Sequence, residues 1–317
     1  MIIVQNSFIM FLQLTEDLHF SKAADRCHVT QQALSDNIRR LESEYGPLFE
    51  RRPQLKLTPA GEAMKQCLLG IRLQENAMRE QIHSIQNGET GEFTLGMNRS
   101  RASILLPRIL PRFYSLYPNI RLNIVFGETR SLETQMFRGK MHAFLGVNTP
   151  LQKSLRMNHI YYDSLYLVIS RQTAIKYLGD AALQIIADGM RGIRIKEFES
   201  IPMVLQNEST TEELLSDYCR KNCVTLNRVL AINDLDTQIE LCQRMNIMTV
   251  CPSMFVSKIM QSNKENGDRD FIYAFPIAGL EKSLRIDMVT PENINLAKWL
   301  SSFIEILTNE CLPYSYM

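Results

Sequence analysis

The sequence SKAADRCHVTQQALSDNIRRLESEYGPLFERRPQLKLTPAG, residues 21–61, decides the fold of the N-terminal part of this chain. It contains two short helical patterns that are separated by a polar turn at residues 28–30. Thr30 is a suitable N-cap for the second helix, which we expect to begin at Gln31. This second pattern places apolar residues on one helical face, namely Leu34, Ile38 and Leu41. A basic hairpin follows directly.

Short polar side chains occupy another face of the second helix, at its first turn. They are Thr30, Gln31, Gln32 and Ser35. The N-terminal residues of such a helix contact base edges in a major groove. Basic residues further along are placed to hold phosphate groups, namely Arg39, Arg51 and Arg52. The sequence therefore predicts a winged helix-turn-helix that binds double-stranded DNA, although an ion pair with Glu42 or Glu44 is an equally open role for Arg39.

The same segment resembles the LysR-type family of bacterial transcriptional regulators. The resemblance rests on AADRCHVTQQALSDNIRRLE at residues 23–42, LFER at 48–51 and LTPAG at 57–61. Several fixed spacings agree over this length, which makes the match specific. Asp36 departs from the family, which often has a basic or small polar residue there. A carboxylate at that position repels phosphate or accepts a hydrogen bond from cytosine.

The composition is that of a soluble globular protein with more than one core. The 317 residues include 45% hydrophobic residues and carry a net charge of +1. The first sixty residues hold as many acidic as basic side chains, so we expect weak, salt-sensitive DNA binding by one copy. There is no membrane-length apolar run and no basic region ahead of the apolar first residues, so we expect a cytoplasmic protein. Seven scattered cysteines fit a reducing compartment, and no cofactor or metal site is expected from their spacing.

A long helix is expected after the hairpin, with Thr58 as its cap and Pro59 at its first position. Its apolar residues recur at steps of three, four and seven, namely Met64, Leu68, Ile71, Met78, Ile82 and Ile85. The helix either lies on its own domain or pairs with a second copy, and we favour pairing. The expected division is a DNA-binding domain at 1–60, a linker and dimerisation helix at 61–90, and a regulatory domain at 91–317.

The regulatory part shows alternating strand and helix patterns. We expect strands at 93–96, 121–125 and 143–147, with helices at 105–117 and 132–138. This alternation predicts an α/β multidomain fold with parallel sheets and helices on both faces. The region resembles the effector-binding half of the LysR-type family, which is similar to periplasmic solute-binding proteins. The resemblance implies subdomain I at about 92–166 and 271–317, subdomain II at about 167–270, and an effector cleft between them.

Candidate effector-binding residues lie in three expected loops that follow strands. They are Asn98, Arg99, Ser100, Arg101, Thr129, Asn207 and Ser209. By the resemblance, Ser100 and Thr129 occupy effector-contacting positions, while helix capping is an equal alternative for both. Arg99 and Arg101 either favour an anionic effector or point to solvent.

These observations favour a transcriptional regulator whose DNA contacts change when a small effector, in the expected case an anion, binds. Expected partners are DNA, the effector, further copies in a homodimer or homotetramer, and RNA polymerase if the protein is an activator. A redox-responsive regulator is an alternative, but the family's reactive cysteine position falls on Thr210, with Cys219 near the resolving position and Cys223 one turn later. A solute-binding module or enzyme without DNA function is the other class, and no catalytic motif supports an enzyme.

Overall fold

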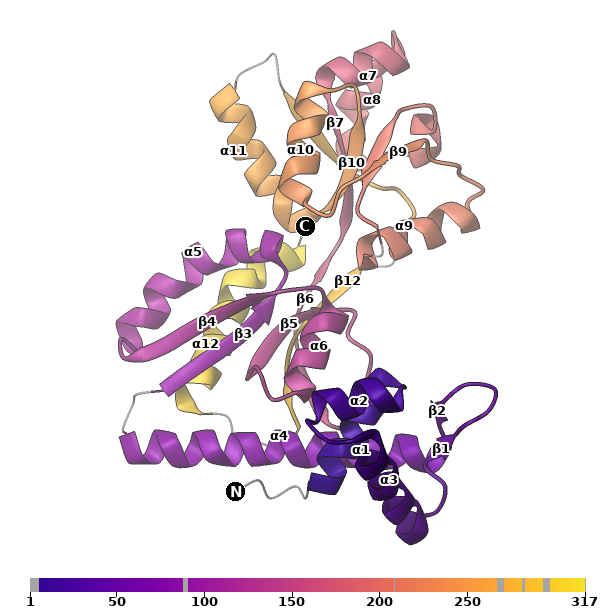
Figure 1. The fold of residues 1–317 in the computed structure, drawn as a ribbon. Helices are drawn as coiled ribbons and strands as arrows, with labels where there is room; N and C mark the ends of the chain where they lie inside the picture. The colour runs from indigo at the N-terminus through magenta and orange to yellow at the C-terminus, as the bar shows by residue number, and fades with distance from the viewer. Residues whose placement is uncertain are drawn as a thin grey trace.

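The computed structural model describes residues 6–87, 91–207, 209–266, 271–280, 283–292 and 297–316. Figure 1 shows three tiers: an N-terminal unit with the long helix α4, a first sheet with its helices, and a second sheet at the far end. Within the described residues, no helix is long and apolar enough to cross a membrane.

The N-terminal unit, residues 6–57, has the predicted helix-turn-helix and wing. Its elements are α1 (Asn6–Asp17), α2 (Phe20–Arg26), α3 (Gln31–Tyr45), β1 (Phe49–Glu50) and β2 (Lys56–Leu57). The predicted start of α3 is confirmed, because the Thr30 hydroxyl accepts a hydrogen bond of 3.1 Å from the Ala33 amide. The predicted apolar face of α3 is buried, in a core that also contains Phe11. Burial of this face holds the three helices together.

Helix α4 (Pro59–Asn87) begins as predicted, with the Thr58 hydroxyl accepting a 3.0 Å hydrogen bond from the Gly61 amide. One of its faces is buried against the rest of the chain, through Leu68, Leu69 and Leu73. Another face is exposed and apolar, through Ile71, Met78 and Ile82. The side chain of Ile85, the last residue of the predicted seam, lies outside the described residues. Part of the helix therefore lies on its own chain, including Leu68 of the predicted pairing seam, while three of the six seam residues are exposed.

The first sheet has the strand order β4-β3-β5-β12-β6. Its strands are β3 (Gly91–Met97), β4 (Ile120–Phe126), β5 (Ala143–Val147), β6 (Leu155–Asp163) and β12 (Leu284–Pro291). Its helices are α5 (Arg99–Leu116), α6 (Thr129–Phe137) and α12 (Lys298–Cys311). The expectation of parallel sheets was incomplete, because β12 pairs antiparallel with both β5 and β6. The chain returns from the second sheet through β12, so this strand runs against the others.

Two helices of this unit begin earlier than the sequence suggested. Helix α5 begins at Arg99 instead of residue 105, and it continues through Pro107 and Pro111. The Asn98 side chain caps it by accepting a 2.9 Å hydrogen bond from the Ser100 amide. Helix α6 begins at Thr129 instead of residue 132. Segments expected as loops after β3 and β4 are therefore first turns of helices.

The second sheet has the order β11-β7-β10-β8-β9. Its strands are β7 (Leu165–Ser170), β8 (Met203–Leu205), β9 (Arg228–Ala231), β10 (Met248–Pro252) and β11 (Ile272–Pro276). Its helices are α7 (Arg171–Leu178), α8 (Ala181–Asp188), α9 (Thr210–Lys221), α10 (Leu235–Arg244) and α11 (Val256–Asn266). The expected subdomain I included residues 271–317. By its strand pairing, β11 belongs instead to the second unit, because it pairs with β7.

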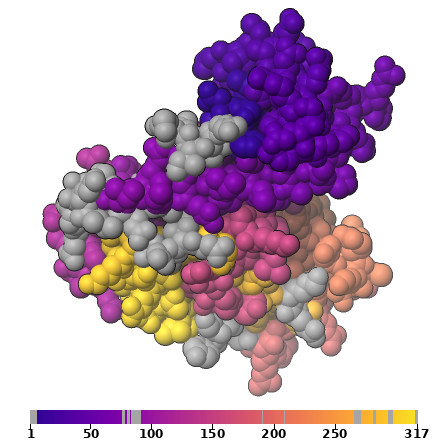
Figure 2. Space-filling view, turned by 90° about the horizontal axis from the view of Figure 1, so that it is seen from below, coloured from indigo at the N-terminus to yellow at the C-terminus, as the bar shows by residue number. Residues whose placement is uncertain are grey.

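The N-terminal unit is in contact with the first sheet's helices through α6. Leu132 and Met136 of α6 belong to the same buried apolar cluster as the N-terminal core. At the end of α6, the Arg138 guanidinium pairs with the Glu16 carboxylate of α1 at 2.7 Å. Seen from below, the N-terminal unit is a separate lobe that α4 connects to the body (Figure 2). The N-terminal unit is thus joined to the body of the molecule by α4 and packs against it through α6.

Candidate functional sites

The predicted base-contacting residues lie at the start of α3. Gln32 is exposed, and Ser35 is half-buried beside the apolar face. The Gln31 side-chain oxygen accepts a 2.7 Å hydrogen bond from the Ser21 hydroxyl of α2, which fixes the two helices relative to each other. Thr30 is used as the cap of α3. Gln32 is therefore the side chain of this group that is most free to contact a base edge.

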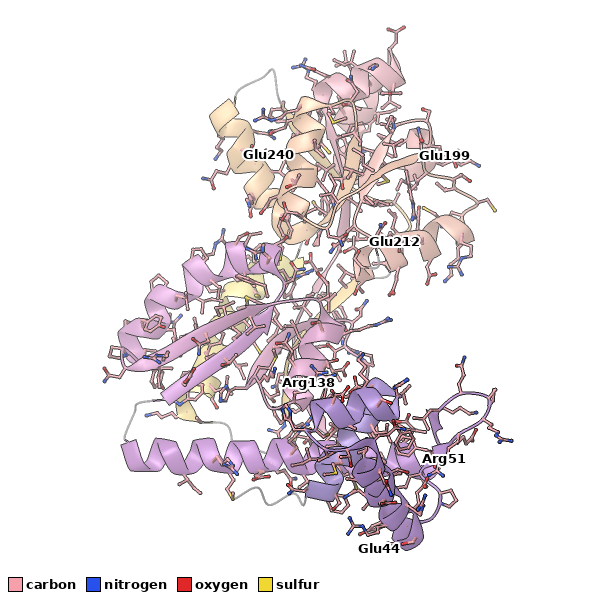
Figure 3. All side chains as sticks on the ribbon, in the orientation of Figure 1. Glu44, Arg51, Arg138, Glu199, Glu212 and Glu240 are labelled. Carbon is pink, nitrogen blue, oxygen red and sulfur yellow. The ribbon has the colours of Figure 1, made fainter. Side chains whose placement is uncertain are left out.

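The predicted phosphate-contacting arginines are largely paired with carboxylates of the same unit. Arg39 pairs at 3.3 Å with Asp36, one turn before it, and not with Glu42 or Glu44. Arg51 of the wing pairs at 2.7 Å with Glu42 of α3, while Arg52 is exposed. Figure 3 shows Arg51 and Glu44 at the outer end of this unit, far from the sheets. Phosphate groups would have to compete with these carboxylates for the arginines.

Glu42 also holds the wing to α3. One of its carboxylate oxygens accepts hydrogen bonds of 3.1 Å from the amides of Leu48 and Phe49. Both of those residues are buried, at 1% and 5% exposure. Sequence reasoning placed Glu42 only as an ion-pair partner of Arg39. Glu42 reaches the Leu48 and Phe49 amides only because the chain turns back after α3. The apolar spacing of the helix does not predict this turn.

A cleft of about 350 Å³ lies between the two sheet-containing units. Residues at the starts of α5, α9 and α10, and the residue before α6, line it. Five of the seven candidate effector-binding residues are among the lining residues, namely Asn98, Arg99, Ser100, Arg101 and Ser209. Thr129 and Asn207 are not among them. The Thr129 hydroxyl instead accepts a 2.9 Å hydrogen bond from the Val147 amide, which fixes α6 to β5.

Several lining residues were not among the sequence candidates. Glu128 and Asp234 supply carboxylates, and Phe126 supplies an aromatic face. Both acidic residues directly precede helices, as the N-caps of α6 and α10. A carboxylate before a helix is a common capping signal and does not by itself indicate a binding site. Only the packing of the two units shows that these caps lie at the same cleft.

The two candidate arginines of α5 differ in their surroundings. The Arg99 guanidinium lies over the Phe126 ring, 4.5 Å from its centroid. Arg101 is buried and pairs with Asp163 at 3.1 Å, while its Nε atom has no hydrogen-bond partner in the structure. The other Asp163 oxygen accepts a 2.8 Å hydrogen bond from the Ser253 hydroxyl of the second unit. Arg101 therefore links the cleft, through Asp163, to Ser253 of the second unit. The sequence alternatives for Arg101, an effector contact or a solvent-exposed side chain, did not include this position.

The family's reactive position and Cys219 do not supply an accessible thiol near α9. Thr210, at the family's reactive position, begins α9 and has no sulfur. Cys219 is buried, and burial raises its pKa above the ordinary thiol value. A raised pKa reduces the thiolate that peroxide chemistry needs. Among the described residues, no group of three or more His, Cys, Asp and Glu side chains is placed to hold a metal ion.

His142 directly precedes β5. Its Nδ1 atom accepts a 3.0 Å hydrogen bond from the Thr94 amide of β3. This bond links β3 to the start of β5. The role of His142 is therefore structural, in positioning strands below the cleft.

Two family models cover almost the whole chain. The model described as "Bacterial regulatory helix-turn-helix protein, lysR family" matches residues 6–62, and the "LysR substrate binding domain" matches residues 86–311. The second model alone covers well over half of the chain. Both boundaries agree with the division between the N-terminal unit and the sheet-containing units.

Curated relatives match about half of this chain. The HTH-type transcriptional regulator YtlI of Bacillus subtilis is 27% identical over 154 residues, which are 48% of this chain and 50% of YtlI. The DNA-binding transcriptional dual regulator OxyR of Escherichia coli is 32% identical over 132 residues, 40% of this chain and 43% of OxyR. The chain thus spans about half the length of the curated relatives it matches.

Solved structures agree with the full-length fold. A full-length OxyR variant from Pseudomonas aeruginosa has a TM-score of 0.58 at 18% identity, with 98% of this chain and 96% of that chain covered. Full-length CbnR in complex with its target DNA has a TM-score of 0.53 at 16% identity, with 96% and 99% covered. At these identities the likeness concerns the fold. With both domain models matched in order, the chain belongs to the LysR family of bacterial regulatory proteins.

Proposed function

We propose that this protein is a DNA-binding transcriptional regulator that a small molecule controls. The observation that carries the proposal is the exposed first turn of α3 beside a basic wing, in one chain with a polar cleft between two sheet units. The helix supplies base contacts through Gln32, and Arg39, Arg51 and Arg52 supply phosphate contacts. We place it in the cytoplasm, without an enzymatic role.

We further propose that two copies pair through α4, giving a homodimer or a dimer of dimers. Ile71, Met78 and Ile82 recur at steps of seven and four and are exposed, although large apolar residues favour burial. Pairing would place two N-terminal units on a partly palindromic site. Ile82→Glu should shift sedimentation from dimer to monomer, whereas Gln66→Glu, an equal charge at an exposed polar position on another face of α4, should not. Unchanged assembly in Ile82→Glu would remove α4 from the interface.

Helix α6 is the proposed route from the cleft to the N-terminal unit. Its N-cap residue Glu128 lines the cleft, and Arg138 at its other end pairs with Glu16. Figure 3 shows Arg138 at the end of α6 that faces the N-terminal unit. An effector that favours one position of α6 would thereby favour one placement of the DNA-binding helices. RNA polymerase is a further partner if the protein is an activator.

The test is selection of random duplex DNA by the full-length protein, followed by footprinting at two salt concentrations. A partly palindromic motif, with protection over neighbouring helical turns, is the expected result. A salt-dependent affinity that is equal for selected and random duplexes would contradict the proposal, since it would reflect phosphate contacts alone. Neighbouring genes of the selected sites then identify candidate effectors.

A further inference from the structure

The charged side chains of the cleft divide into those that already have a charged partner and those that do not. Arg101 pairs with Asp163, and Glu212 pairs with Arg228. Figure 3 shows Glu212 at the start of α9. Among the described residues, the lining charges left without a salt bridge are Arg99, Glu128 and Asp234. One cation and two carboxylates are therefore available to a ligand.

The positive part of the cleft is the start of α5. This helix has 18 residues, a neutral N-cap in Asn98 and no acidic residue in its first turn. No acidic residue of the helix itself offsets its N-terminal partial positive charge, and Arg99 adds a full charge beside it. Arg101 in the same turn is 94% buried and keeps an Nε donor that has no partner in the structure. These donors favour a carboxylate.

The negative part of the cleft contains one carboxylate from each unit. Glu128 belongs to the first unit and accepts hydrogen bonds from two neutral amides, those of Asn98 at 2.7 Å and Gln206 at 3.5 Å. Asp234 belongs to the second unit and accepts a 2.9 Å bond from the Thr237 amide. Hydrogen bonds from the Thr237 hydroxyl and amide, with Arg99 nearby, lower the pKa of Asp234. The two carboxylates outnumber the one cation, Arg99, so a ligand with only negative charge would add to a net negative charge in the cleft.

Apolar side chains form the remaining wall. They are Phe126, Val147, Leu205, Leu235, Val250, Pro252 and Phe255. We propose that the cleft binds a zwitterion of the α-amino acid type, with its carboxylate at the start of α5 and Arg99, its ammonium group between Glu128 and Asp234, and its side chain on the apolar wall. The inference rests on the proposed function of this cleft as the effector site. It replaces the expected simple anion by a zwitterion, which can pair with both the positive and the negative part of the cleft. An ammonium group between carboxylates of opposite units would also draw the units together.

The test measures binding to the full-length protein by titration calorimetry. The probes are L-leucine and L-phenylalanine, their analogues without the amino group (4-methylpentanoate and 3-phenylpropanoate), and their analogues without the carboxyl group (3-methylbutylamine and 2-phenylethylamine). We expect at least one zwitterion to bind, and to bind at least about tenfold more tightly than either of its own analogues, since each lacks one charge-assisted contact. Equal or tighter binding of the matching carboxylate, or no binding of either amino acid at millimolar concentration, overturns the assignment.

Two isosteric variants test the ammonium position. Glu128→Gln keeps an oxygen for Asn98, and Asp234→Asn keeps a residue type that caps α10. Each should weaken zwitterion binding about ten- to a hundredfold and leave binding of the carboxylate analogue unchanged or stronger. Asp217→Asn is the matched control, because Asp217 pairs with Arg220 on α9 and is not among the cleft residues. Equal affinity in all three variants overturns the assignment of Glu128 and Asp234.

The failure of this inference is separable from the failure of the proposed function. DNA selection is carried out without any ligand, so a selected motif with no zwitterion binding refutes the ligand class alone. Zwitterion binding with no preference among duplexes refutes the regulator and leaves the ligand class standing.

Discussion

Replacing Glu42 should separate two contributions to the stability of the wing. The carboxylate accepts hydrogen bonds from the Leu48 and Phe49 amides and pairs with Arg51. Glu42→Ala removes all three contacts. Glu42→Gln keeps a side-chain oxygen that can accept from both amides, but it loses the charge that holds Arg51.

The expected magnitudes follow from burial. Each hydrogen bond from a buried amide to a carboxylate contributes about 1.5 kcal/mol, and an amide left unpaired adds to the loss. The Arg51 pair contributes only about 0.5 kcal/mol, because the side chain of Arg51 is 53% exposed. We therefore expect a loss of about 3 to 4 kcal/mol in the free energy of unfolding of the N-terminal unit for Glu42→Ala. For Glu42→Gln we expect a loss of about 1 kcal/mol.

Hydrogen exchange of the full-length protein, followed on peptides that cover residues 46–58, measures this loss directly. Protection of that segment should fall more than about a hundredfold in Glu42→Ala and less than about tenfold in Glu42→Gln. Glu44→Ala is the control, since Glu44 is an exposed residue of α3. Equal loss of protection in the alanine and glutamine variants would refute the reasoning, because it would mean that the charge, and not the two amide bonds, holds the wing.

Three further outcomes are expected. Gln32→Ala should change which duplex is preferred in a selection experiment, whereas Arg52→Gln should weaken all duplexes alike and reduce the salt slope by about one unit. Asp36→Asn should strengthen binding to all duplexes and steepen the salt dependence, since it frees Arg39 for phosphate; an unchanged slope in competition binding would place Arg39 away from DNA. Hydrogen bonds from Thr237 lower the folded-state pKa of Asp234 below its unfolded value of about 3.9. The ionised Asp234 carboxylate therefore stabilises the folded protein fully above the unfolded pKa, and this stabilisation is lost as the pH falls through the folded pKa. In a profile of melting temperature measured between about pH 2.5 and 6, Asp234→Asn should flatten the fall at the acidic end.

The N-terminal unit was the most predictable part of the molecule. Local signals determine where its helices begin and which face is buried, such as the Thr30 and Thr58 caps and the apolar spacing of α3. These signals act over three or four residues, which is the distance over which a sequence pattern is informative. The three strands expected in the regulatory part were also located within two residues of their ends.

The cleft was less predictable because its residues meet only through the packing of two units. Five candidates line it, but no local pattern brings Glu128 and Asp234 together, since 106 positions separate them and each simply precedes a helix. Thr129 was an expected contact and instead bonds to Val147, because α6 begins at that residue. The start of α5 was missed because the residues after β3 were expected to form a loop, whereas Asn98 caps a helix there.

The pairing of charges within the N-terminal unit bears on the proposed pairing of two copies. Arg39, Arg51 and Lys56 each have a carboxylate partner within 3.3 Å in the same unit. Exposed pairs of this kind contribute at most about 1 kcal/mol each, so phosphate can displace the carboxylates, but the freed negative charge then stays near the DNA. One unit therefore gains little from each phosphate contact. Two units joined through α4 add their contacts without a second cost of association, so a sequence-specific affinity is expected from the dimer and not from the monomer. The Ile82→Glu variant separates these cases, since its loss of DNA affinity should be recovered by fusing two copies through a flexible linker.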